Sequence, residues 1–172
     1  MKNHFTVLSG LLFLLLISSC EQKAHQTINL KAESKAVENV LEKYVIANEQ
    51  KDFSIIEQIW APDSDILLFG TDTDEKLMGW KNIQAAIKTQ FSSISDTYIS
   101  VSDQHIKINN TGNTAWFAEI MNYNFVYQGQ ARSYEGIRFT GVMEKRPDGW
   151  KIVQAHLSLP AHVGIKPIVK QK

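Results

Sequence analysis

The polar side chains best suited to chemistry stand in the middle of two apolar segments in the second half of the chain. Arg138 and Thr140 alternate along one segment, and Gln154, His156 and Ser158 alternate along the other. Because alternate residues of a strand share a face, each set is expected to point in one direction. A charged or amide group within a sheet must be paired or must face a wet cavity. We therefore predict that both sets converge in one cavity and bind its ligand; a hydrogen-bonded network that only fixes the sheet is the alternative.

Three aromatic residues, Trp60, Phe69 and Trp80, are assigned to the apolar wall of this cavity. Asp72 follows the apolar run that ends at Phe69, and we expect it near the cavity mouth. There it is the best candidate for a catalytic general base, with His156 as its proton partner, because an imidazole titrates near neutral pH. The alternative is that Asp72 only caps its loop.

Glu119 shares a strand face with Phe117 and is assigned to the same ligand site. Two alternatives stay open for it, an ion pair with Arg138 and a position on the outer face of the sheet. No metal or cofactor is expected. The histidines lack a paired zinc spacing, and the acidic run at residues 71–75 is followed by Leu77 where a calcium loop needs glycine.

The composition excludes several classes of protein. The chain has 172 residues, with 18 Lys and Arg against 18 Asp and Glu, and this formal charge of zero argues against a nucleic-acid binder. Hydrophobic residues make up 44% of the chain, which excludes global disorder. The single cysteine, Cys20, cannot form an intrachain disulfide or a cysteine-rich zinc site. One globular domain fits this length.

Residues 1–19 are predicted to be a signal peptide. Lys2 precedes an apolar run at residues 5–17, which is shorter than the roughly 20 residues of a spanning helix. Its end, Ile17-Ser18-Ser19-Cys20, resembles the bacterial lipobox, whose cysteine becomes the lipidated first residue after cleavage. We expect an exported domain held on a membrane of the bacterial cell envelope by acyl chains on Cys20, with residues 20–30 as a polar tether. A stray cysteine in an ordinary cleaved signal is the alternative.

Hydrophobic spacing predicts helices in the first half of the exported part and strands in the second. Apolar residues recur at helical spacing between Val37 and Val45, and Ser54 with Glu57 fits a capping box at the start of a second helix. Turn sequences separate the later segments, which indicates antiparallel hairpins. Helices are expected over residues 31–50, 53–60 and 80–94, and strands over 66–69, 98–108, 115–127, 134–145 and 150–159. This order indicates an α+β fold with the helices on one face of a curved sheet.

Several fragments, in this order, resemble the SnoaL-like branch of the nuclear transport factor 2-like superfamily. They are Phe69-Gly70-Thr71-Asp72, Met78-Gly79-Trp80, Ala115-Trp116-Phe117, Arg138-Phe139-Thr140-Gly141-Val142 and residues 150–160 (WKIVQAHLSLP). The resemblance covers about residues 32–161; we place the domain at 31–161 and a C-terminal tail at 162–172. It implies a cone-shaped, curved antiparallel or mixed sheet with three N-terminal helices packed on its concave face, open at one end into a pocket.

The superfamily contains both enzymes and noncatalytic domains, so the fold does not choose a function. We favour a pocket domain that binds a small, partly apolar or anionic ligand, or that acts as a dimeric interaction module. One alternative is an isomerase, dehydratase or cyclase that uses acid and base groups in the same pocket. Another is an assembly domain that uses the outer sheet face.

A homodimer through the outer face of the sheet is also implied by the resemblance. The last strand supports it, because Trp150 and Ile152 are expected to lie opposite Val153 and Leu157. A sheet that is apolar on both faces needs helices on one face and a partner on the other.

Overall fold

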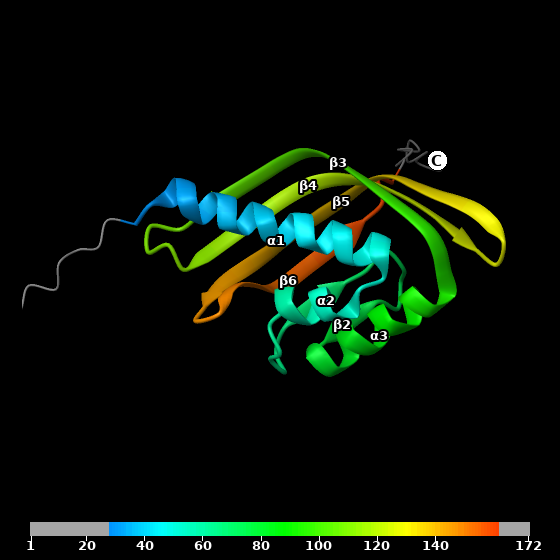
Figure 1. Cartoon of the computed structure of the whole chain (residues 1–172), viewed down its shortest axis with the longest axis horizontal. Helices are drawn as coiled ribbons and strands as arrows, with labels where there is room; N and C mark the ends of the chain where they lie inside the picture. Colours follow the sequence, from blue (N-terminus) through cyan, green and yellow to red (C-terminus); the bar gives the residue numbers. More distant parts are fainter. Residues whose placement is uncertain (1–27, 162–172) are drawn as a thin grey trace, which may run out of the picture.

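The computed structural model describes residues 28–161, and within them three helices cover one face of a curved sheet (Figure 1). The elements follow one another as α1 (Leu30–Gln50), α2 (Phe53–Ile59), β1 (Leu67–Phe69), β2 (Lys76–Met78), α3 (Trp80–Ser93), β3 (Ile94–Ile108), β4 (Thr114–Tyr127), β5 (Gln130–Arg146) and β6 (Gly149–Ser158). The predicted α+β class, with helices on the concave face of an open, mixed sheet, is confirmed.

The helices begin at local hydrogen-bonding signals. Asn29 caps α1, where its side chain accepts a hydrogen bond from the backbone N–H of Ala32. Asp52 caps α2 by accepting from the backbone N–H groups of Ser54 and Ile55, so the capping box predicted for Ser54 is wrong. The carboxylate of Asp52, two residues earlier, is a stronger acceptor than the serine hydroxyl.

Gly79 precedes α3 with a φ of 79°, a conformation that favours glycine. A Cβ at this position would also lie 2.8 Å from the backbone oxygen of Ser64. The link between β2 and α3 therefore depends on a residue without a side chain.

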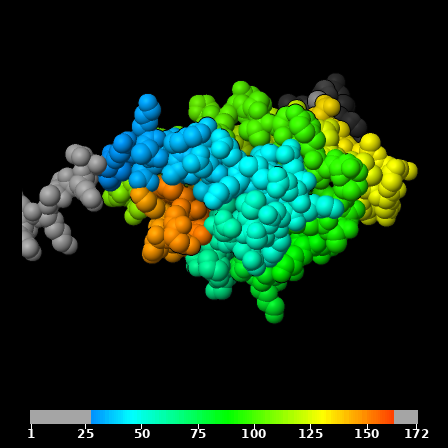
Figure 2. All heavy atoms as spheres, viewed as in Figure 1, coloured from blue at the N-terminus to red at the C-terminus, as the bar shows by residue number. Residues whose placement is uncertain are grey.

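The sheet runs in the order β2-β1-β6-β5-β4-β3. Neighbouring strands are antiparallel except for β1 and β6, which are parallel, so the sheet is mixed. Register shifts interrupt each of the long antiparallel pairs, and such bulges increase twist and bend a strand. The strands thus curve around the helices, while the yellow tip of the β4–β5 hairpin extends beyond them (Figure 2).

The core fills the space between α1 and the middle of the sheet. Phe139 lies at its centre, stacked on Tyr44 of α1 with ring centroids 4.6 Å apart and edge-on to Phe117 of β4 at 4.9 Å. The ring of Phe117 lies over Gly141, its partner across the β4–β5 pair. These contacts make the concave face of β4 and β5 the apolar face.

The bulge in the β5–β6 pair changes which residues of β6 share a face. Met143 pairs with Ile152 and Gly141 pairs with Ala155, so Val153 is the extra residue. Ile152 and Leu157 therefore lie on the same concave side, whereas strict alternation would place them opposite. The argument for a dimer from two apolar faces of β6 is wrong for this reason.

Candidate functional site

A cavity of about 720 Å³ lies between the open end of the sheet and the helices. Each of the three helices or its flanking loop contributes to the wall, as do all strands of the sheet. The lining residues are Tyr44, Asn48, Trp60, Leu68, Gly70, Thr71, Asp72, Glu75, Leu77, Ala86, Ile87, Thr89, Gln90, Ile94, Tyr123, Phe125, Tyr134, Ile137, Leu157 and Leu159. Such a volume suits a small organic molecule.

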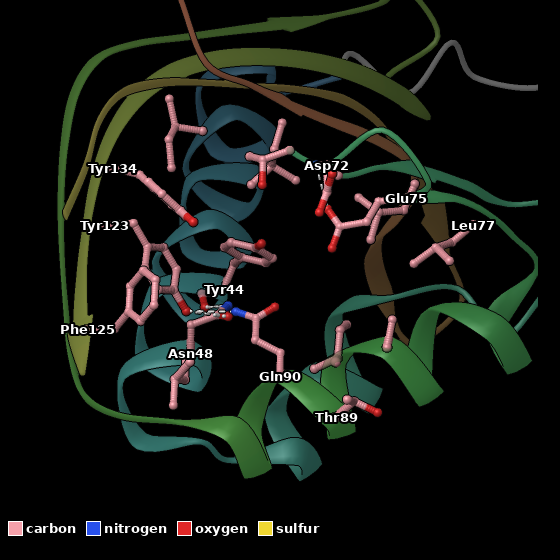
Figure 3. Close-up of a pocket in the computed structure, with 18 of the residues that line it drawn as sticks. Tyr44, Asn48, Asp72, Glu75, Leu77, Thr89, Gln90, Tyr123, Phe125 and Tyr134 are labelled. Carbon is pink, nitrogen blue, oxygen red and sulfur yellow. Dashed lines mark hydrogen bonds between the residues drawn. The ribbon is translucent and has the colours of Figure 1, made fainter. Parts of the chain in front are cut away.

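One wall of the cavity carries a hydrogen-bonded group of polar side chains. The Tyr123 hydroxyl accepts a hydrogen bond from Nε2 of Gln90 at 2.9 Å and donates to Oδ1 of Asn48 at 3.3 Å. Nδ2 of Asn48 donates in turn to the backbone oxygen of Tyr44 at 2.8 Å. Helices α1 and α3 are thereby joined to β4 at the cavity wall (Figure 3).

The two tyrosines of this wall are held in their neutral form. Burial raises the pKa of Tyr123 to about 12, against the lowering effect of the hydrogen bond from Gln90. Burial also raises the pKa of Tyr44, and the nearby Tyr123 adds to that effect. At neutral pH both hydroxyls therefore remain hydrogen-bond donors and acceptors.

Aromatic rings surround this polar group. Phe125 lies edge-on between Tyr123 and Tyr134, with centroid distances of 5.7 Å and 5.5 Å. Tyr134 and Ile137 both reach the cavity because a bulge at Gly136, whose φ is 68°, shifts the alternation of β5. The backbone N–H of Gly136 donates to the Asn122 side chain at 2.9 Å, which holds the bulge in place.

The loop between β1 and β2 brings two carboxylates to the other side of the cavity. Figure 3 shows Asp72 and Glu75 across the cavity from Tyr123 and Tyr134. The backbone N–H of Asp72 donates to Glu75 Oε2 at 3.0 Å, and that of Thr73 donates to Asp72 Oδ1 at 2.7 Å. A Cβ on Gly70 would overlap the Glu75 carboxylate, so a glycine is required for this arrangement.

Among the lining residues, Asp72 and Glu75 carry charge and no Lys, Arg or His is present. The described part of the chain contains no group of three or more His, Cys, Asp and Glu side chains that could hold a metal ion. None of the helices within residues 28–161 has the length and apolar character needed to cross a membrane.

The sequence-predicted residues divide between the cavity and other places. Trp60 and Asp72 line the cavity, and their role there stays a prediction. Trp80 stacks on Phe53 at 6.1 Å outside the cavity wall. Phe69 is exposed and lies edge-on to His156 at 5.9 Å. The predicted aromatic wall is therefore wrong for Trp80 and Phe69.

The polar residues of β5 and β6 lie on the convex face, and the prediction that they converge in the cavity is wrong. Arg138 pairs with Ser158, Thr140 with His156, and Val142 with Gln154. Their neighbours along each strand, such as Phe139 and Ala155, are buried beneath the helices, so alternation turns these side chains outward. Arg138 and His156 are exposed to solvent, which supplies the hydration that a cavity was expected to provide.

Consequently the proposed acid–base pair is not assembled. Asp72 lines the cavity, whereas His156 lies on the convex face and does not. A proton transfer between these two side chains has no support in this geometry.

Glu119 lies on the concave face and is 2% exposed, but it does not line the cavity. Its Oε2 accepts a hydrogen bond from Nε2 of Gln104 at 2.8 Å, and Oε1 has no partner among the described residues. A bulge in β3, with Asp103 at a φ of 50°, directs Gln104 inward. Both alternatives for Glu119, the pair with Arg138 and the outer face, are wrong, and burial raises the pKa of its carboxyl.

Sequence reasoning missed Tyr44, Asn48, Glu75, Gln90 and Tyr123. Asn48 offered a signal, because an amide that falls on the apolar stripe of a helix must find a polar partner. Tyr123 offered another, since it shares the apolar face of β4 with Phe117. Glu75 and Gln90 lie in segments whose sequence carries no comparable signal.

Comparisons with known proteins agree with this architecture. A family model described as a SnoaL-like domain matches residues 37–162. Among the curated proteins, none matches the chain. The solved structures supply matches to the fold alone, because their sequence identity to the chain is low.

A nuclear transport factor 2-like superfamily protein from Salmonella enterica serovar Typhimurium superposes with a TM-score of 0.71 at 19% identity, over 83% of this chain and 99% of that one. A proposed dehydratase of that family from Streptomyces avermitilis gives 0.69 at 17% identity, over 77% and 99%. A proposed scytalone dehydratase from Novosphingobium aromaticivorans gives 0.68 at 13% identity, over 83% and 97%.

Proposed function

The chain belongs to the SnoaL-like domain family, and we propose that it uses its cavity to bind a small, largely apolar ligand with one hydrogen-bonding end. The observation that carries this proposal is the 720 Å³ cavity with aromatic walls and one polar group, Tyr123 with Asn48 and Gln90. Apolar walls with a few placed polar atoms are typical of small-molecule sites. An anionic ligand is not favoured, since no cationic side chain lines the cavity.

The neutral apolar dye Nile red tests this function. Ala86 of α3 lines the cavity, whereas the neighbouring Ala85 is exposed and does not. We expect the wild type and Ala85→Trp to bind the dye with enhanced fluorescence, and Ala86→Trp to lose binding because the indole fills the cavity. Equal binding by both variants would place the dye elsewhere and contradict the proposal.

An acid–base enzyme of the isomerase, dehydratase or cyclase type is the second candidate. The observation that favours it is the position of Asp72 and Glu75 across the cavity from the Tyr123 hydroxyl (Figure 3). A carboxylate can remove a proton beside a carbonyl, while a neutral phenol stabilises the resulting oxyanion. Two of the matched structures are named as proposed dehydratases.

Proton abstraction can be measured directly. NMR in heavy water follows deuterium exchange next to the carbonyl of 2-tetralone, a ketone that fits the cavity. Enzymatic chemistry predicts exchange above the buffer rate with the wild type, and its loss in Asp72→Asn/Glu75→Gln. Exchange at the buffer rate would show that the protein does not catalyse proton abstraction from this ketone.

We also propose that the domain is a lipoprotein of a bacterial cell envelope. The support is the Ile17-Ser18-Ser19-Cys20 sequence behind an apolar run. These residues lie outside the part of the chain that the structure describes, and α1 begins at Leu30. Mass spectrometry of the protein from a bacterial host should find an N-terminus at Cys20 with a diacylglyceryl adduct. An unmodified N-terminus would contradict this proposal.

A homodimer through the convex sheet face is proposed as well. One row of paired residues crosses this face, and four of its six members are apolar: Lys107, Trp116, Val142, Gln154, Leu67 and Met78. Trp116 and Met78 are each about half exposed, so a second copy could cover the apolar members of this row.

Light scattering on the soluble domain tests the dimer. We expect twice the monomer mass for the wild type and for Tyr127→Glu, a control at the exposed hairpin tip. Trp116→Glu should give the monomer mass, because it buries a charge at the interface. A monomeric wild type at high micromolar concentration would overturn the proposal.

A further inference from the structure

We infer that the ligand of the cavity is an amine, whose ammonium group lies at the mouth beside the carboxylates of Asp72 and Glu75. The inference rests on the proposed binding function and adds the charge of the ligand to it. It differs from the sequence-based expectation of an anion, which depended on Arg138 facing the cavity.

The two carboxylates are held in position with free capacity to accept hydrogen bonds. Glu75 Oε2 accepts from the backbone N–H of Asp72, and Asp72 Oδ1 accepts from that of Thr73. Each group has a second oxygen, and Figure 3 shows the Glu75 carboxylate pointing into the cavity towards Tyr44. An ammonium group donates three hydrogen bonds and accepts none, so it can bind to the free carboxylate oxygens of Asp72 and Glu75.

The negative charge of the pair is not neutralised by a cation of the described chain. Neither Asp72 nor Glu75 forms an ion pair with any residue of the range 28–161. Lys76 follows Glu75 directly, but Leu77 lines the cavity, so alternation turns Lys76 to the other side. A cation bound at the mouth would offset the repulsion between the two carboxylates.

The inner walls suit the rest of such a ligand. Rings from Tyr44, Trp60, Tyr123, Phe125 and Tyr134 line the cavity, and a cation is attracted to the face of an aromatic ring. Burial is the main cause of the raised pKa of Tyr44, and Glu75 contributes to it, so the field of this carboxylate reaches the inner wall.

Three probes of one shape separate the charge of the ligand from its size. Tyramine, tyrosol and 4-hydroxyphenylacetate share a phenol and carry an ammonium, a neutral hydroxyl and a carboxylate at the other end. By titration calorimetry and ligand-observed NMR, tyramine should bind about tenfold more tightly than tyrosol, a difference of about 1.4 kcal/mol. The carboxylate probe should bind most weakly. Added salt should weaken the binding of tyramine and leave the affinity for tyrosol unchanged.

Matched variants locate the effect at the mouth. Glu75→Gln and Asp72→Asn keep an oxygen that accepts the loop hydrogen bonds, and they should each reduce the preference for tyramine over tyrosol. Asp74→Asn is the control, since Asp74 is exposed in the same loop and does not line the cavity. It should keep the wild-type preference. An equal loss in the control would assign the effect to general surface charge and overturn the inference.

The outcomes distinguish this inference from the binding function on which it rests. If tyrosol binds as tightly as tyramine, or the carboxylate probe binds best, the inference about charge is wrong while the cavity still binds ligands. If none of the probes binds and Nile red does not bind either, the binding function itself is contradicted, and with it the inference.

Discussion

The space between α1 and the sheet has two halves, which the same strands line in different ways. In the packed half, Phe139 stacks on Tyr44 and contacts Phe117, whose ring lies over Gly141. In the hollow half, Tyr123, Phe125 and Tyr134 stand around a cavity of about 720 Å³, and Tyr44 lies at the border because it also lines this cavity. Both halves are rich in aromatic rings, so composition does not distinguish the packed half from the hollow one.

The difference arises from where the backbone departs from regular geometry. In the packed half Gly141 has no side chain, and this lets the ring of Phe117 come close to β5. In the hollow half the bulge at Gly136 turns Tyr134 and Ile137 to the same side and carries the hairpin away from the helices. Side chains should therefore contribute mainly to stability in the packed half and mainly to ligand affinity in the hollow half.

Truncating a ring in each half should give the largest effect. Phe139 is completely buried, so Phe139→Ala should reduce the free energy of unfolding by about 3–5 kcal/mol. Phe125 is partly buried beside the cavity, and Phe125→Ala should cost only about 1–2 kcal/mol, because little packing is lost. Urea denaturation measures both values. Similar losses would show that the two halves do not differ in this way.

Glu119, at the border of the packed half, should give a pH-dependent effect. Because burial raises its pKa above the ordinary 4.5, the folded state favours the protonated carboxyl. The stability that this group contributes is present below that value and is lost as the pH rises through the folded-state pKa. Glu119→Gln cannot ionise and should therefore become more stable relative to the wild type as the pH is raised from about 4 to about 8.

Chemical denaturation across this pH range tests the effect of Glu119. The exposed carboxylate of Glu135 provides a control, and Glu135→Gln should follow the wild-type curve. A stability difference between Glu119→Gln and the wild type that is independent of pH would contradict the assigned cause.

In the hollow half, Tyr123→Phe should affect binding more than folding. It removes the hydroxyl that joins Gln90 to Asn48 and keeps the ring. We expect a loss of about 1 kcal/mol in stability and about a fivefold weaker affinity for tyrosol, the neutral probe. Thermal unfolding and calorimetry measure the two quantities. Unchanged affinity would show that the Tyr123 hydroxyl does not contact the ligand.

The smallest effect is expected on the convex face. Arg138 is exposed and forms no ion pair with a described residue, so Arg138→Met should change stability by less than about 0.5 kcal/mol. Tyramine and tyrosol should bind as they do to the wild type. A marked loss of ligand affinity would mean that this residue reaches the cavity after all.

Sequence periodicity predicted the long elements well because burial imposes it. The helices at residues 31–50 and 80–94 and the four long strands lie within a few residues of their observed bounds. The short strand β2 was missed, since three residues after an acidic turn, of which only Leu77 is half-buried, are too few to show a pattern. The predicted capping box failed because Asp52, two residues before Ser54, caps the helix instead.

The candidate site was harder to predict, for two physical reasons. Polar residues in mid-strand were expected to need a cavity, yet the convex face of an open sheet gives Arg138 and His156 access to water. Bulges also change which side chains of a strand share a face, as the bulge at Gly136 does in β5. A single inserted residue of this kind leaves no signal in the hydrophobic spacing. The residues of the cavity come from all six strands and from all three helices or their flanking loops, which no local pattern brings together.

The interruptions of β3 have a consequence for solubility as well as for curvature. This strand of 15 residues forms one edge of the sheet, and a long, regular edge offers unpaired amides to strands of other molecules. Asp96 and Asp103, with φ values of 49° and 50°, break its register at two places. Each register shift places a charged side chain and a kink where a strand of another molecule would have to pair with β3. The same distortions that bend the sheet around its cavity thus protect the molecule from aggregation through its edge.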